Sequence, residues 1–216
     1  MAGRTTPPPE SLARFGVPTR AVHAVTGLLV LACIATAAIL YNGSLATMVG
    51  HRHTVRQIHV WRGFSLPVPL LFGLLARSYR ADVGRLNRFS SDDRRWLRSP
   101  AHWDGAVRVG KFNAGQKLNA AASAGAIATL FLTGAVMYFT SWTPLSWRSG
   151  ATFTHDWFAL GLGLLVLAHM GLAVHDPIAL RGMAGGRVPV DWARRHHGAW
   201  AVELAAERAD DPAASE

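Results

Sequence analysis

The chain has 216 residues, of which 50% are hydrophobic and only 16% are charged, and its formal net charge at pH 7 is +9. A soluble domain of this size normally carries about a quarter charged residues, so the composition argues against a single soluble core and favours a membrane domain. The positive charge does not indicate a nucleic-acid partner, because the arginines cluster between long apolar stretches and not on one soluble face.

Four apolar stretches are long enough to cross a bilayer as helices. Each is close to the roughly 20 residues that span about 30 Å of hydrocarbon at a rise of 1.5 Å per residue. None alternates apolar and polar residues, as the strands of a membrane barrel must. The sequence therefore predicts an all-α membrane protein, a bundle of four transmembrane helices at Ala21–Tyr41, His59–Ala76, Leu118–Phe139 and His155–His175.

The second stretch is the least regular, because it contains Arg62, Pro67 and Pro69. The prolines should kink this helix, which a bundle tolerates where its neighbours satisfy the freed carbonyls. In the segments outside the bundle, we expect Ser91 to cap a helix with Asp92 and Asp93 in its first turn. Near the C-terminus, we expect a surface helix at Trp192–Arg208, followed by a tail.

Lysine and arginine residues divide unevenly between the two sides of the bundle. Three precede the first helix, ten lie in loop 77–117 and five follow the last helix, whereas four occur on the other side. The positive-inside rule therefore places both termini and the long loop in the cytoplasm. We divide the chain into a cytoplasmic segment 1–20, a transmembrane domain 21–175 and a cytoplasmic C-terminal part 176–216.

Ionisable side chains in spanning segments are costly and usually functional, and four of the ten histidines lie in or at the ends of the predicted helices. His23 is near the cytoplasmic start of the first helix, and His59 is near the outer start of the second. His155 and His169 share the fourth helix, fourteen residues or about 21 Å apart. Fourteen steps of about 100° also return a side chain to within about 40° of its first direction. We therefore expect His59 to pair with His155 at the outer level. His23 would pair with His169 at the inner level.

Haem b is the cofactor that best fits each of these two histidine pairs. Two neutral imidazoles on opposite faces of a haem give a six-coordinate iron that changes redox state with little rearrangement. Covalent attachment of haem is excluded, because the chain has no C-x-x-C-H motif and its one cysteine, Cys33, lies in an apolar run. The alternatives are that the four histidines are hydrogen-bonded core residues or members of a proton relay.

The other six histidines are not expected to bind iron. His175 follows His155 by twenty residues, which places it about 200° around the helix. The remaining five lie in predicted loops or in the terminal segment: His51, His53, His102, His196 and His197.

Two arginines lie about one helical turn from predicted ligands. Arg20 precedes His23 by three residues, and Arg62 follows His59 by three. We expect these arginines to neutralise propionates of the inner and outer haems respectively. The alternative is that both simply reach the membrane interface.

A polar segment, KFNAGQKLN at residues 111–119, precedes the third helix at the level of the inner haem. It offers amide donors at Asn113, Gln116 and Asn119 and a glycine at Gly115 that permits close backbone approach. A quinone needs hydrogen-bond donors at its carbonyls and a supply of protons. Composition alone favours the simpler interpretation, a helix start rich in polar residues.

With these motifs the chain resembles the cytochrome b (gamma) subunit of membrane-bound formate dehydrogenases. The resemblance extends from Arg20 to Trp200. It rests on RAVH at 20–23, KFNAGQK at 111–117, TGAVM at 133–137, the histidine spacing of the last helix and RGMAGGRVPVDWARRHH at 181–197.

The resemblance implies a function in respiratory electron transport. The chain would receive electrons from an iron–sulfur (beta) subunit outside the cytoplasm, pass them through two haems b and reduce menaquinone or ubiquinone. Asn113, Gly115, Gln116 and His169 would border the quinone. Oxidation of the donor would take place in a catalytic (alpha) subunit containing molybdenum or tungsten. The chain would then be the quinone-reducing subunit of an oxidoreductase complex in the bacterial cytoplasmic membrane.

Two other functions remain open at this point. The cytochrome b subunit of a nickel–iron hydrogenase would do the same work for a different donor. A haem-free membrane anchor or proton-coupled transporter would use the histidines differently, and it would show no haem absorption bands on reduction.

Overall fold

The computed structural model describes residues 11–100 and 107–210. Three helices in this part of the chain are long and apolar enough to cross a membrane: α1 (Val17–Tyr41), α7 (Ala114–Tyr138) and α8 (Leu145–His175). Only 6–11% of the residues in their most apolar windows are buried within the protein. Helices with this much exposed apolar surface need an apolar surrounding, which is what a bilayer supplies.

The second predicted span is a broken helix. It consists of α3 (Arg52–Ser65) and α4 (Pro67–Gly73), followed by α5 (Arg77–Leu86). The helix is interrupted directly before Pro67, as expected, but the large change of direction comes later: α5 is bent by 106° from the run Arg52–Gly73. The described residues therefore contain three spanning helices, or four if this bent pair counts as one span.

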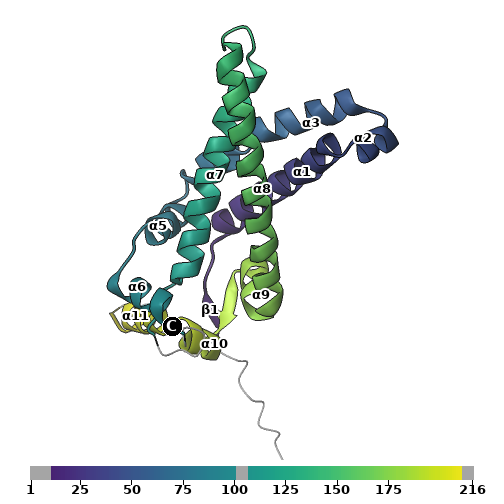
Figure 1. Cartoon of the computed structure of the whole chain (residues 1–216). Coiled ribbons are helices and arrows are strands. Elements are labelled where there is room, and N and C mark those ends of the chain that lie inside the picture. Colours follow the sequence, from purple (N-terminus) through teal and green to yellow (C-terminus); the bar gives the residue numbers. More distant parts are fainter. Residues whose placement is uncertain (1–10, 101–106, 211–216) are drawn as a thin grey trace, which may run out of the picture.

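Figure 1 shows two long helical hairpins that cross each other. One hairpin pairs α1 with α3 through the short helix α2 (Gly43–Val49), and the other pairs α7 with α8. An apolar cluster at their crossing joins both hairpins: Val30, Leu66, Ala126, Ile127 and Leu162. Such contacts fix the relative depth of side chains on the two hairpins.

The segment before α1 and the segments after α8 meet at the base of the bundle. Strand β1 (Ser11–Ala13) pairs with β2 (Arg187–Pro189) in antiparallel register, with Leu12 opposite Val188. Helix α9 (Pro177–Gly185) ends at Gly186, whose φ of +82° favours glycine and whose carbonyl accepts from the backbone of Arg14 at 2.8 Å. The described part of the chain is thus mostly helical, with one small sheet that the sequence did not predict.

The C-terminal part is a packed cap and not a single surface helix. It contains α10 (Val190–His196) and α11 (Gly198–Asp210), separated at His197. Trp192 and Trp200 are only 3% and 2% exposed and pack with Leu12, Val188 and Ala193. The prediction of one surface helix at Trp192–Arg208 was wrong, because these indole rings form the core of the base.

The long loop carries helix α6 (Ser91–Arg98). Its N-cap is Ser90 and not Ser91, one residue before the predicted cap. The Ser90 hydroxyl accepts from the backbone of Asp93, and the Asp93 carboxylate accepts from the backbone of Ser90 at 2.7 Å, so both ends of a capping box are present.

Candidate haem sites

The outer histidine pair joins the two hairpins. His59 comes from α3 and His155 from α8, and their ring centroids lie 6.3 Å apart with an interplanar angle of 67°. Both side chains are half-buried. His155 lies ten residues inside α8 and not at its start, because the helix continues to Leu145 beyond the apolar stretch.

The inner pair has nearly the same geometry. His23 from α1 and His169 from α8 have ring centroids 6.1 Å apart and an interplanar angle of 57°. Both residues are exposed on the helix surfaces. The structure therefore brings together the same two pairs that helical spacing predicts.

These separations suit a metal held between two imidazoles. With a metal–nitrogen distance of about 2 Å on each side, the two ring centroids would be roughly 6 Å apart. Among the described residues, no group of three or more His, Cys, Asp or Glu side chains could hold a metal ion. A pair of imidazoles is a sufficient protein ligand set where a porphyrin supplies the other four nitrogens, so the residues present fit haem.

Glycines leave open space along the helices that carry the ligands. A Cβ atom added at Gly27, Gly63, Gly161 or Gly163 would meet nothing within 4 Å. At Gly134 it would lie 3.5 Å from Cε1 of His155, so this glycine lets the imidazole lie against α7. A flat macrocycle beside the first four positions would meet backbone and not side chain.

Two threonines contact the outer pair and were missed from the sequence. The hydroxyl of Thr36 lies 2.9 Å from Nδ1 of His59, and that of Thr133 lies 2.9 Å from Nδ1 of His155. Each contact joins two helices, so a pattern within one helix could not reveal it. Thr133 opens the TGAVM motif, which was the one available signal.

The two predicted propionate partners differ in their surroundings. Arg20 donates from Nη1 to the carbonyl of Ala184 near the end of α9, while its buried Nε has no hydrogen-bond partner. Arg62 is exposed and forms no hydrogen bond or ion pair with another described residue. The guanidinium of Arg62 is thus free for an external anion, whereas that of Arg20 is partly engaged.

The KFNAGQK segment forms the start of α7. Asn113 accepts from the backbone of Gln116 at 2.8 Å, and Gln116 accepts from the backbone of Asn113 at 3.0 Å. A Cβ atom at Gly115 would lie 3.2 Å from the ring of Trp96. The two side-chain carbonyls therefore cap the helix, which leaves the amide NH₂ groups as the donors that a quinone could use.

Ion pairs anchor both ends of this segment. Lys111 pairs with Asp82 at 2.5 Å, and Asp82 also accepts from Thr19 at 2.9 Å. Lys117 pairs with the buried carboxylate of Asp93 at 2.7 Å. A hollow of about 190 Å³ beside the second of these pairs is lined by Asn113, Asp93 and Lys117.

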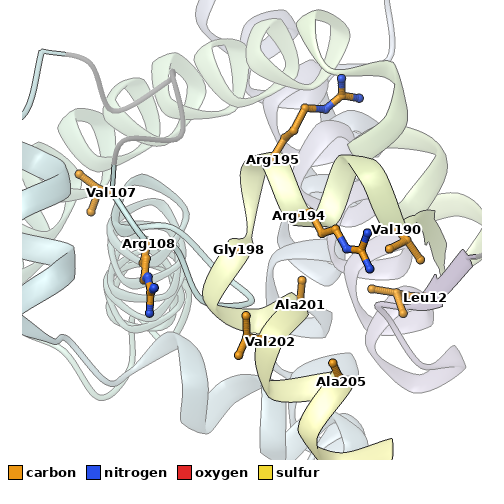
Figure 2. Close-up of a pocket in the computed structure, with 10 residues that line it drawn as sticks. All are labelled: Leu12, Val107, Arg108, Val190, Arg194, Arg195, Gly198, Ala201, Val202 and Ala205. Atoms are coloured by element: carbon orange, nitrogen blue, oxygen red, sulfur yellow. The ribbon is translucent and has the colours of Figure 1, made fainter.

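A larger hollow, of about 680 Å³, is lined by residues of the C-terminal cap, of β1 and of the long loop (Figure 2). None of the predicted ligands lines it. Its three arginines, Arg108, Arg194 and Arg195, point in different directions in Figure 2 and do not converge on one position. Nothing in this arrangement resembles a site for the predicted cofactor.

The histidines not assigned to iron lie elsewhere, and His102 lies outside the described residues. His197 is 3% exposed at the base, where Nδ1 faces the carbonyl of Gly110 at 2.7 Å and Nε2 lies 2.9 Å from Arg14. Burial and the neighbouring guanidinium lower the pKa of His197 to about 3. Burial likewise lowers the pKa of Arg14 to about 10. His197 is thus a neutral structural residue of the base.

Comparison with known proteins identifies relatives among b-type cytochromes. A family model described as prokaryotic cytochrome b561 matches residues 14–186. The chain is 32% identical over 99 residues to the cytochrome b556(Fdn) subunit of the nitrate-inducible formate dehydrogenase of Escherichia coli (strain K12), an alignment that covers 44% of this chain and 46% of the relative. It is 33% identical over 94 residues to the formate dehydrogenase cytochrome b556 subunit of Haemophilus influenzae, covering 42% and 40% respectively. The matched part thus spans less than half the length of these curated relatives.

Proposed function

Because the chain belongs to the prokaryotic cytochrome b561 family, we propose that it is the dihaem cytochrome b subunit of a formate dehydrogenase complex. In this role it transfers electrons from an iron–sulfur subunit across the membrane to a quinone. The observation that carries the proposal is the pair of 6.1 and 6.3 Å histidine contacts, which share α8 at positions fourteen residues apart. That spacing corresponds to about 21 Å, most of the thickness of the hydrocarbon core.

The residues of the chain have separate roles in this proposal. His59 and His155 hold the outer haem, and His23 and His169 hold the inner one. Arg62 and Arg20 neutralise propionates at the outer and inner levels. When bound, the two haems supply one-electron redox centres. The apolar faces of the helices, together with the bilayer, would keep water away from the path between the two levels.

The quinone site of the proposal lies at the base, near the inner haem. Asn113 and Gln116 have amide NH₂ groups suited to quinone carbonyls, Gly115 permits close approach, and His169 borders the same site. Cytoplasmic protons would reach the quinone here while electrons arrive from the outer side. Moving one unit charge against a membrane potential of 100 mV costs about 2.3 kcal/mol. The complex therefore needs a strongly reducing donor, and formate is one.

Partners and topology complete the proposal. An iron–sulfur (beta) subunit would dock on the outer side, and a catalytic (alpha) subunit with molybdenum or tungsten would oxidise formate. The names of the relatives support formate over hydrogen as donor. Both termini would lie in the cytoplasm, which is supported by the meeting of β1, α6, α10 and α11 at one end of the bundle (Figure 1).

Haem counting tests the proposal directly. We expect a pyridine haemochrome assay of the purified protein to give two haems b per chain. His155→Ala and His23→Ala should each leave one, whereas His53→Ala, an exposed histidine of α3, should keep both. Protein without haem would identify a haem-free membrane protein, and two haems in both ligand variants would refute the pairing. Nickel in place of molybdenum or tungsten in the purified complex would identify a hydrogenase.

A further inference from the structure

The two threonines that contact the outer histidines have equivalent environments. The Thr36 hydroxyl lies 2.7 Å from the carbonyl of Ala32, four residues earlier in α1, and 2.9 Å from Nδ1 of His59. The Thr133 hydroxyl lies 2.7 Å from the carbonyl of Thr129, four residues earlier in α7. The same hydroxyl lies 2.9 Å from Nδ1 of His155. Each hairpin thus presents its outer histidine in the same way.

The contacts of each threonine favour one direction for its hydrogen bonds. A threonine hydroxyl has one proton, and in both residues a backbone carbonyl at 2.7 Å accepts it. The oxygen can then only accept from the imidazole. We therefore assign the proton to Nδ1 in both rings, which leaves Nε2 with its lone pair.

The inner pair lacks such support. Neither His23 nor His169 forms a hydrogen bond with another side chain or backbone group in the part of the chain that the structure describes. The outer rings, by contrast, each contact a threonine of the neighbouring helix. The two pairs therefore share their ring separation and differ in what holds each ring.

We propose that Thr36 and Thr133 are positioning residues of the outer haem site, a role that rests on the proposed function. Each hydroxyl holds its histidine in the tautomer whose Nε2 can bind iron, and it fixes the orientation of the ring. A hydrogen bond from Nδ1 also makes Nε2 a stronger donor. Stronger donors favour ferric over ferrous iron, so the threonines lower the midpoint potential of the outer haem and leave the inner haem unaffected.

Isosteric variants test this role. Thr36→Val and Thr133→Val remove the hydroxyl and keep the shape, whereas Thr36→Ser and Thr133→Ser keep the hydroxyl. Thr129→Val is the matched control, because this residue of α7 also donates to the carbonyl four residues earlier but forms no hydrogen bond with a histidine among the described residues. Haem content and midpoint potentials would be measured by redox titration of the purified complex. A His23→Ala background isolates the outer haem.

We expect each valine variant to raise the midpoint potential of the outer haem and the double variant to raise it further. The double variant should also bind the outer haem about 10- to 100-fold more weakly. Serine should restore both properties, and Thr129→Val should change neither. Two haems with unchanged potentials in the double valine variant, or an equal change in the control, would overturn this inference while the proposed function stands. A wild-type protein without haem would overturn both.

Discussion

His197 is a buried histidine whose protonation makes folding depend on pH. Its pKa is about 3 in the folded chain, against an ordinary value of 6.5 in the unfolded chain. Above pH 6.5 both states are neutral at this site and no stability is lost. As the pH falls from 6.5 towards 3, the unfolded chain gains a proton that the folded chain does not, so stability decreases by up to about 1.4 kcal/mol per pH unit.

This linkage predicts how two neighbouring histidines differ. His197→Gln should reduce the loss of thermal stability between pH 7.5 and pH 5, measured as the unfolding midpoint in detergent. His196→Gln is the control, since His196 packs on the edge of the base against Trp192. An equally large acid-induced drop in wild type and in His197→Gln would show that other groups dominate the pH dependence.

Asn113 combines a structural and a proposed binding role, and these can be separated. Asn113→Asp keeps the oxygen that accepts from the backbone of Gln116, replaces the amide donor and adds a negative charge, which the helix N-terminus accommodates. Helix α7 should therefore remain capped, while loss of one hydrogen bond slows quinone-dependent reoxidation of the reduced haems by about tenfold. Asn87→Asp makes the same change in the long loop and should leave the rate unaltered. Stopped-flow absorption at the haem bands measures both rates, and an unchanged rate in Asn113→Asp would remove this residue from the site.

At the scale of elements, helix α6 depends on a carboxylate that serves two partners. Asp93 accepts from the backbone of Ser90 at 2.7 Å and from Lys117 at 2.7 Å. Burial acts to raise the pKa of Asp93, but the hydrogen bonds from Lys117 and Ser90 outweigh it and lower the pKa. This carboxylate therefore joins the long loop to the start of α7.

Removal of this carboxylate should be much more costly than removal of its neighbour. We expect Asp93→Ala to lower the free energy of unfolding by about 3 kcal/mol, because it removes a cap and leaves Lys117 without its buried partner. Asp92→Ala affects an exposed pair with Arg95 and should cost less than about 1 kcal/mol. Denaturant unfolding followed by tryptophan fluorescence compares the two variants. Similar losses would mean that the capping box adds little.

The sequence predicted helices better than it predicted their ends and their partners. The end of α1 at Tyr41 agrees with the prediction, because an apolar run and the helix stop together there. Helix α8 begins ten residues before the predicted start, since hydropathy measures apolar length and intrahelical hydrogen bonds continue into polar sequence. The bend between α4 and α5 was expected at the prolines but follows Gly73, where a Cβ atom would lie 2.7 Å from Val22.

Contacts between distant segments explain what the sequence could not predict. The histidine pairs could be predicted from helical spacing, because one member of each pair, His155 or His169, lies on the long helix α8. The pairing of Leu12 with Val188 and the contact of Thr36 with His59 join different elements and leave no periodic signal in either. These contacts depend on how the hairpins and the base pack as a whole.

At the scale of the whole molecule, the base ties together three segments that are far apart in sequence. The backbone of Ala199 donates to the carbonyl of Val109 at 3.0 Å, and Arg85 pairs with Glu203 at 2.6 Å. The first strand, the long loop and the C-terminal helices must therefore lie on one side of the membrane. Those segments hold most of the lysine and arginine residues, so this side should be the cytoplasm.

Cysteine labelling in cells tests this orientation. In a Cys33→Ser background, single cysteines would replace exposed residues at both ends of the bundle: Ser44 and Ser149 on the outer side, and Ser91 and Glu207 at the base. The outer membrane would be permeabilised while the cytoplasmic membrane stays intact. A maleimide that cannot cross the cytoplasmic membrane should then label the positions on the outer side, and it should label the base positions only after lysis. Two positions are used on the outer side because a partner subunit could cover one of them. Labelling of Ser91→Cys and Glu207→Cys in intact cells would show that the orientation is the opposite of the predicted one. Electrons that enter from outside would then reach the pair His23 and His169 first.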